Sequence, residues 1–244
     1  RELRGEYLKA IRDETKIIED TYMEEYFLID QKITERAKKR YNTYISPTSR
    51  GSAGSFYVNK LLDIIGMDRM IAPVTLYPTR FMSTTRILES KSLPDIDINT
   101  SNRDGLIKAS EDILGEEYCG WLITYKPLKM SGAFRLWCKA KDIPFNEYNE
   151  FAKHIAECES KGDNSYLHDE KWKNELNECK VFVGVIESIS PSPCSMVLST
   201  ERVPSHFGLI KIKDQICCNL DKTSCDDYKY LKNDYLKVTV YEIV

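Results

Sequence analysis

Apolar residues recur at helical spacing within the first forty or so residues of the chain, among many charged ones. Tyr22, Tyr26, Leu28, Ile29 and Ile33 supply the apolar stripe. Such a stripe is typical of an amphipathic helix that packs one face against a core. The sequence therefore predicts that residues 1 to about 40 are helical.

The next hundred or so residues alternate between strand and helix patterns. A short strand near 44–45 leads through a Ser/Gly loop to a helix over 56–65. A strand then carries residues 93–99, a helix follows over 103–114, and an apolar strand spans 119–124. Strand, helix, strand is the order of an α/β layer, so we expect a sheet with flanking helices.

Pro127 marks a change in the pattern. The following fifty or so residues are polar and helix-rich, with an internal loop at Gly162–Asn164. From Val181 short β-rich runs return, at 181–186, 196–198, 208–210 and 238–241. We interpret this as one sheet domain interrupted by a helical insertion, with boundaries at 1–126, 127–180 and 181–244.

Charge and cysteine content narrow the protein class. The net charge of -3 argues against general affinity for nucleic acid, but basic residues cluster at 32–50 and 126–141. Such local basic faces suit contact with a phosphate backbone, and the alternative is a solvated helix face.

The eight cysteines include no Cys-x-x-Cys pair, and no secretory signal or membrane-spanning apolar run is present. Free thiols in a reducing cytosol are the expectation.

The segment Leu93–Asn99 carries two carboxylates, Asp95 and Asp97, two residues apart. On a strand both would project from one face, where each would raise the pKa of the other unless a cation lay nearby. Mg²⁺ prefers such hard oxygen ligands, which makes phosphoryl or nucleotidyl transfer the first reaction class to consider. Taken alone, Asp-x-Asp is more often a solvated turn or strand edge.

A Ser/Gly loop, Arg50–Ser55, lies about forty residues before the two acids and opens a predicted helix. Glycines let a backbone approach a ligand, while hydroxyls and free first-turn N–H groups donate to anions. The loop could cradle a triphosphate, although it lacks the Walker lysine pattern. The alternative is a flexible turn with Ser52 or Ser55 as a helix N-cap.

Taken together, these segments resemble the ordered motifs of the C-family replicative DNA polymerases, the bacterial DNA polymerase III alpha subunits. The motifs that carry the resemblance are Arg50–Ser55, Pro78–Phe81, Pro94–Asp97 and Leu231–Leu236, with Glu25–Ile29 upstream. The resemblance covers nearly the whole chain and is weakest over 142–177. Asn99, where many members carry a third Asp, is more similar to Gram-positive or phage-type replicases, so a phage-encoded or divergent bacterial enzyme is indicated.

The resemblance implies a fold and a reaction. The sheet and flanking helices would form a palm of the beta-type nucleotidyltransferase kind, and the helical insertion would be a thumb that grips duplex product. The reaction would transfer dNMP from dNTP to a primer 3′-hydroxyl, using two Mg²⁺ ions, for which Mn²⁺ could substitute. Its partners would be primer-template DNA and dNTP.

The resemblance also implies roles for individual residues. The catalytic and metal-binding residues would be Asp95, Asp97 and Asp234. Nucleotide-binding residues would be Gly51, Ser52, Ser55, Arg80, Lys232, Arg50 and Arg86. DNA-binding residues would be Lys129, Arg135 and Lys139.

Two positions depart from the family pattern. Ser131 stands where many members have a lysine, although Arg135 matches a family arginine, and Lys129 is a candidate replacement for the missing lysine. Pro193-Cys194 replaces a His-Ala type pair, so no role can be carried over for that histidine.

The chain has 244 residues, starts at Arg1 and ends soon after the last motif, which suggests an excised piece of a much longer replicase. We expect such a piece to be weakly active or inactive alone, with the sliding clamp bound through other regions, in the cytoplasm of a bacterium or phage-infected host. Two alternatives remain open: a non-catalytic DNA- or partner-binding scaffold, and a nucleotidyltransferase with another acceptor.

Overall fold

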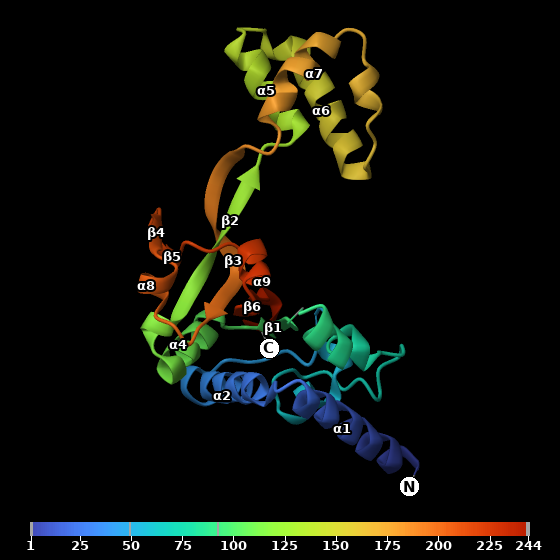
Figure 1. Ribbon diagram of the computed structural model, residues 1–244, viewed down its shortest axis with the longest axis vertical. Coiled ribbons are helices and arrows are strands. Elements are labelled where there is room, and N and C mark those ends of the chain that lie inside the picture. Colours follow the sequence, from blue (N-terminus) through green and yellow to red (C-terminus); the bar gives the residue numbers. More distant parts are fainter. Residues whose placement is uncertain (1, 49, 92, 243–244) are drawn as a thin grey trace. The chain divides into compact units, whose positions relative to one another are not determined.

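The computed structural model describes residues 2–48, 50–91 and 93–242. The chain forms two compact units. Figure 1 shows the ribbon, coloured along the sequence from the N-terminus to the C-terminus. The large unit comprises Arg1–Ile123 and Pro191–Val244, and the small unit comprises Thr124–Ser190. Among the residues that the structure describes, no helix is both long and apolar enough to cross a membrane.

The sequence predicts the positions of the long helices of the large unit, but not the break within the N-terminal helical region. The expected N-terminal helical region is two helices, α1 (Glu2–Asp20) and α2 (Glu24–Tyr41). The helix α4 (Arg103–Leu114) begins at Asn102, whose Oδ1 accepts a hydrogen bond of 3.1 Å from the Gly105 N–H. It ends at Gly115, which has a positive φ of 101°. Both ends are therefore fixed by local residues.

The main sheet has the strand order β1-β6-β3-β2. Its strands are β1 (Ile96–Thr100), β6 (Leu231–Lys237), β3 (Ile186–Leu198) and β2 (Cys119–Pro127). β6 runs parallel to β1 and antiparallel to β3. The sheet is mixed and carries flanking helices, which confirms the predicted α/β fold class.

A second sheet consists of the antiparallel strands β4 (Leu209–Ile212) and β5 (Gln215–Cys218). Short helical elements complete the large unit: η2 (Pro78–Arg80), η3 (Thr85–Glu89), η4 (Glu116–Tyr118), α8 (Val203–His206) and α9 (Lys222–Asp227).

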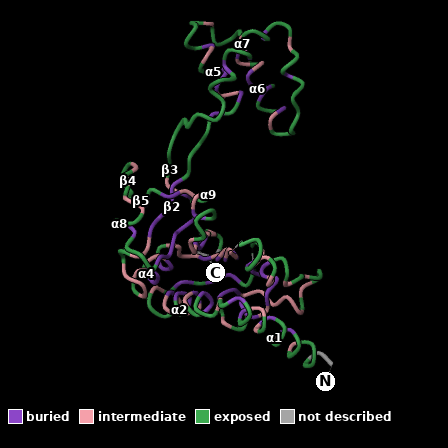
Figure 2. Tube along the Cα trace, viewed as in Figure 1, coloured by how far each residue is buried: buried purple, intermediate pink, exposed green. Residues whose placement is uncertain are grey.

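The core of the large unit lies between the main sheet and α2 and α4, where buried positions concentrate (Figure 2). Phe27 from α2 and Leu106 from α4 pack in one apolar cluster with Ile96, Ile98 and Tyr235 from the strands. Because strand side chains alternate between faces, the same packing sends the intervening residues of β1 and β6 to the opposite face.

Three local predictions are wrong. The helix expected over 56–65 is only α3 (Tyr57–Leu61), preceded by the 3-10 turn η1 (Ala53–Ser55). The expected strand at 44–45 is a single bridge between Ile45 and Thr100. The run at 238–241 falls in the 3-10 turn η7 (Thr239–Glu242), and the strand is instead β6. Short apolar runs do not distinguish strand from turn by periodicity alone.

The small unit is helical and has its own core. Its helices are α5 (Met130–Ala140), α6 (Phe145–Lys161) and α7 (Lys173–Cys179), with turns η5 (Ser165–His168) and η6 (Lys180–Phe182). The Trp172 ring stacks on the Phe151 ring, with 6.1 Å between the ring centres, and forms an edge-to-face contact with Phe134, with 5.3 Å between the ring centres. The unit is somewhat longer than the insertion expected over 127–180, and residues 181–185 are not in a strand.

Candidate active site

Asp97 and Asp234 meet because of strand register. β1 and β6 are parallel neighbours, and Asp97 is the direct partner of Asp234. Asp95 comes immediately before β1, and its charge acts on Asp97 together with that of Asp234. The structure thus brings together the three acids that the sequence singled out, on the face of the sheet opposite to the core.

Asp97 and Asp234 are partly or largely buried from solvent. Burial, together with the charges of Asp234 and Asp95, raises the pKa of Asp97 to about 6. Asp234 is only 7% exposed, and its Oδ1 is buried without a hydrogen-bond partner. The cluster therefore has strong demand for positive charge.

Two lysines meet part of this demand. Lys232 is 5% exposed, and its Nζ lies 2.6 Å from Asp95 Oδ1 and also donates to Asp226. Burial alone would lower the pKa of Lys232, but the hydrogen bonds to Asp226 and Asp95 outweigh it and the pKa is raised. Lys222 Nζ lies 3.5 Å from Asp234 Oδ2 and 4.0 Å from Asp95 Oδ2.

Lys222 and Asp226 were missed by the sequence reasoning. Both lie on α9, whose first turn is capped by Asp221, which accepts hydrogen bonds from the Thr223 and Ser224 N–H groups. The two residues are four positions apart, which places them on one face of a helix. Their proximity in sequence to Lys232 and Asp234 is the signal that could have found them.

Gly51 places the Ser/Gly loop directly against the acids. Its φ is +72°, and a Cβ at this position would lie 1.9 Å from Asp97 Oδ2. Only glycine fits both the backbone conformation and the contact. The backbone of the loop therefore forms one wall of the acid cluster.

Comparison with known proteins identifies the family of the chain. The sequence model of the bacterial DNA polymerase III alpha NTPase domain matches residues 1–237. The chain belongs to this family. The match confirms the family resemblance that the ordered motifs indicated.

The chain shares only modest sequence identity with individual DNA polymerase III alpha subunits. The chain is similar to the DNA polymerase III subunit alpha of Staphylococcus epidermidis RP62A, with 30% identity over 151 residues, 61% of this chain and 13% of that protein. It is also similar to the DNA polymerase III subunit alpha of Staphylococcus aureus Mu50, with 22% identity over 253 residues, 98% of this chain and 23% of that protein. The chain thus spans less than a quarter of the length of these relatives.

The two serines of the loop, Ser52 and Ser55, differ in burial and in hydrogen bonding. Ser55 is 3% exposed, and both its N–H and its hydroxyl donate to the Ser52 carbonyl, at 3.0 and 2.7 Å. Ser52 is half-buried. The helix that follows, α3, has five residues and is shorter than the helix expected over 56–65.

The predicted arginines lie on the turns before β1. Arg80 is exposed at the end of η2, and Arg86 Nη1 donates to the carbonyl oxygens of Arg80 and Phe81, at 2.7 and 3.2 Å. Phe81 is fully buried and packs against Phe56 at 5.3 Å. Arg86 therefore braces the turn that carries Arg80. Arg50 is exposed beside Gly51.

Basic residues outside the acid cluster differ in their surroundings. In the small unit Lys129 and Lys139 are exposed, while Arg135 Nη1 donates to Asn149 Oδ1 at 2.6 Å. On α2 the basic stretch is paired with the protein's own acids. Arg36 and Arg40 both contact Asp112 Oδ2, at 3.3 and 3.0 Å. This pairing favours the solvated-face interpretation for the α2 stretch.

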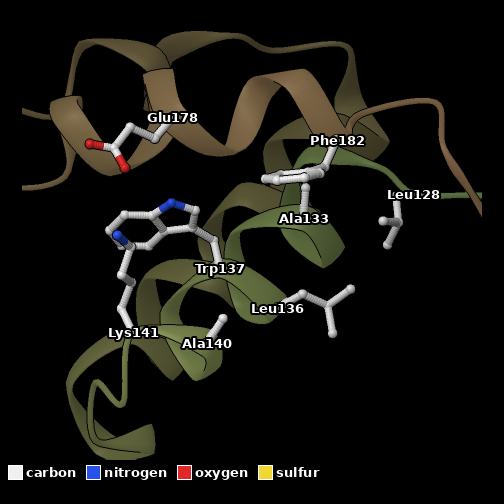
Figure 3. A pocket seen from close by; sticks show the side chains of 8 residues that line it. All are labelled: Leu128, Ala133, Leu136, Trp137, Ala140, Lys141, Glu178 and Phe182. Carbon is white, nitrogen blue, oxygen red and sulfur yellow. The ribbon is translucent and has the colours of Figure 1, made fainter.

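The small unit also contains a pocket of about 640 Å³, lined chiefly by apolar side chains (Figure 3). Trp137, Leu136 and Phe182 contribute to its walls, and Lys141 Nζ lies 5.4 Å from the centre of the Trp137 ring. None of the predicted catalytic, nucleotide-binding or DNA-binding residues lines it.

The donor set of the acid cluster fits a hard divalent cation. Asp95, Asp97 and Asp234 offer carboxylate oxygens only, and the buried Asp234 Oδ1 lacks a hydrogen-bond partner. Within the described residues, no three His, Cys, Asp or Glu side chains stand ready-arranged around one ion. Asp95 is instead turned to Lys232, so holding an ion requires this side chain to turn.

Proposed function

We propose that this chain is the catalytic palm, with the small unit as thumb, of a DNA-directed DNA polymerase. The observation that carries the proposal is the register of β1 and β6, which sets Asp97 opposite Asp234 with Asp95 beside them. Membership of the polymerase III alpha family and the names of the relatives support it. The acceptor would be the 3′-hydroxyl of a DNA primer, and the donor a dNTP, in the cytoplasm of a bacterium or of a phage-infected cell.

The three acids would hold two Mg²⁺ ions, or Mn²⁺ in their place. The ions would supply activation of the primer hydroxyl and neutralisation of charge at the α-phosphate. The contribution of the chain is to fix the carboxylates on adjacent strands before substrate arrives, so that little reorganisation is needed during the reaction.

The phosphates would lie along the Gly51 loop. Gly51 and Ser52 would approach them with backbone N–H groups and the Ser52 hydroxyl, while Ser55 holds the loop from within through its bonds to the Ser52 carbonyl. Arg80, Arg50 and Lys232 would add positive charge, and Arg86 would support Arg80. Lys222 joins this group because its ammonium already contacts two of the acids.

Duplex DNA would contact the small unit through its exposed cations. Lys129, just before α5, and Lys139, on α5, are both exposed. Arg135 is held by Asn149 and would contact phosphate from a fixed position. Phosphate contacts of this kind carry affinity without sequence preference.

The test is metal-dependent nucleotide binding. Calorimetry with a non-hydrolysable dNTP, with and without Mn²⁺, would compare the wild-type chain with Asp97→Asn and with the control Asp214→Asn, an exposed acid between β4 and β5. Binding that needs Mn²⁺ and disappears only in Asp97→Asn supports the proposal. Binding that ignores both Mn²⁺ and Asp97 contradicts it.

One observation favours a second candidate, a non-catalytic scaffold. Lys232 and Lys222 already compensate the acids, as they would in a structural ion-pair network. A scaffold would show no Mn²⁺-dependent nucleotide binding at all. In the longer protein that contains this segment, Asp97→Asn would then leave primer extension unchanged, whereas the polymerase proposal expects it to fall at least about a thousandfold.

A further inference from the structure

The helix α2 contacts the chain next to two of the three acids. Tyr26 Oη donates to the Pro94 carbonyl oxygen at 2.9 Å. One helical turn later, Asp30 Oδ1 accepts a hydrogen bond of 2.5 Å from Asn233 Nδ2. Pro94 and Asn233 are the residues immediately before Asp95 and Asp234. One turn of one helix therefore reaches the residues next to Asp95 and Asp234.

The alternation of side chains along β6 explains how this is possible. Lys232 and Asp234 face the acid cluster, while Asn233 and Tyr235 face the core. Tyr235 Oη shares a 2.8 Å hydrogen bond with Ser110 Oγ on α4, and Asn233 Nδ2 lies 3.4 Å from Tyr235 Oη. The buried face of β6 is thus fixed by polar contacts to two helices, directly behind the acids.

The Asp30–Asn233 contact can make a second hydrogen bond. Both residues are fully buried, and Asp30 Oδ2 and Asn233 Oδ1 are left without partners. A protonated carboxyl and an amide each present one donor beside one acceptor, so the Asp30 hydroxyl can donate to Asn233 Oδ1. Burial raises the pKa of Asp30 to about 7, which keeps the proton available near neutral pH.

We propose that Tyr26 and Asp30 form a two-point clamp on α2 that sets the position of Asp95 relative to Asp234. Tyr26 holds the carbonyl before Asp95, and Asp30 holds the amide before Asp234 through a pair of hydrogen bonds. Both are positioning residues, because neither touches the acids' reactive face. The consequence for metal binding rests on the function proposed above, whereas the fixing of the two strands does not.

The experiment is a Mn²⁺ titration of the 244-residue chain by calorimetry. The variants are Asp30→Leu, Asp30→Asn and Tyr26→Phe. The matched control is Thr34→Val, because Thr34 is 1% exposed on the same helix and its hydroxyl donates within that helix, to the Gln31 carbonyl. Circular dichroism verifies that each variant is folded.

Asp30→Leu should weaken Mn²⁺ binding about ten- to hundredfold, as loss of a partner behind a metal ligand does. Tyr26→Phe should weaken it less, about three- to tenfold. Asp30→Asn should stay within about threefold of wild type, because two amides keep both hydrogen bonds. Folded Asp30→Leu and Tyr26→Phe proteins that bind like wild type would overturn the proposal, as would equal weakening in Thr34→Val.

Amide hydrogen exchange separates this proposal from the proposed function. If the wild-type chain binds no Mn²⁺, the metal site is wrong, and exchange then decides about the clamp. Faster exchange in β1 after Tyr26→Phe and in β6 after Asp30→Leu, with neither in Thr34→Val, supports it. Unchanged or uniformly faster exchange overturns it. Should Asp30→Leu fail to fold, the β1 response to Tyr26→Phe decides by the same criterion.

Discussion

Asp97 and Asp234 lie directly opposite each other on the adjacent parallel strands β1 and β6. Opposite residues of neighbouring strands project to the same face, so the two carboxylates must share one region of space. The fold tolerates their repulsion in two ways: the pKa of Asp97 is raised to about 6, and lysines stand beside the cluster. A divalent cation would relieve the same repulsion more completely.

Gly51→Ala should disable this cluster. The new Cβ would lie 1.9 Å from Asp97 Oδ2, so the loop or the carboxylate must move. We expect Mn²⁺ and nucleotide affinity to fall at least about tenfold, together with roughly 1 kcal/mol of stability lost through the positive φ. Calorimetry and urea unfolding would measure the two effects.

Gly208→Ala is the matched control, because Gly208 also has a positive φ, +75°, but nothing lies within 4 Å of the added Cβ. It should lose a similar amount of stability and no affinity. Equal loss of affinity in the two variants would show that backbone strain, and not contact with Asp97, is responsible.

The stability of the chain should fall as pH rises through neutrality. The folded pKa of Asp30, about 7, lies above its ordinary value of 3.8, so the folded chain keeps a proton that the unfolded chain releases. This contribution is complete below about pH 4 and is lost as pH rises through about 7. Asp97, whose pKa is raised to about 6, acts in the same direction.

Asp30→Asn removes one of these two groups. Its free energy of unfolding should exceed that of the wild type at pH 8 by a few kcal/mol and approach it near pH 4, since one pKa unit corresponds to about 1.4 kcal/mol. Urea unfolding at several pH values would measure the difference. Parallel curves for the two proteins would mean that folding does not raise the pKa of Asp30.

Much of the fold could be predicted because its signals are local. The helix α4 follows from its cap at Asn102 and its stop at Gly115, and β1 follows from the apolar residues around Asp97. The family was identifiable because its motifs kept their order along the chain. Asp234 by itself carried no local signal and was found only through that resemblance.

What could not be predicted depends on contacts between distant segments. No periodicity specifies that Asp97 pairs with Asp234, because register is set by packing of the whole sheet. Ser55 looked like a ligand contact, yet its hydroxyl is used inside the loop. Lys222 was not singled out, because no motif marks it and its contacts with Asp95 and Asp234 arise only when α9 folds beside the sheet.

Lys222→Gln should strengthen binding of a divalent cation. The ammonium lies 3.5 Å from Asp234 Oδ2 and competes for the same carboxylate. Since the Lys222 side chain is about half exposed, screening limits the gain to about three- to tenfold at low salt, and less at high salt. Mn²⁺ titration at two salt concentrations would measure it.

Lys211→Gln, an exposed position on β4, makes the same change of charge elsewhere in the large unit. It should leave Mn²⁺ affinity nearly unchanged. If both variants bind Mn²⁺ alike, the effect of Lys222 is one of net charge and not of contact with the acids.

Lys232→Met should destabilise the large unit. The buried ammonium joins Asp95 to Asp226, and its loss would leave two facing carboxylates without their cation. Because both acids are partly solvated, we expect a loss of about 2–3 kcal/mol, below the range for a fully buried pair. Urea unfolding would measure it. The control Lys222→Met, an exposed partner of the same cluster, is expected to cost at most about 1 kcal/mol.

Adding Asp226→Asn to Lys232→Met should recover part of the loss, because the substitution removes one of the two unpaired charges. A double variant as unstable as the single one would mean that Lys232 stabilises the fold through packing of its aliphatic chain.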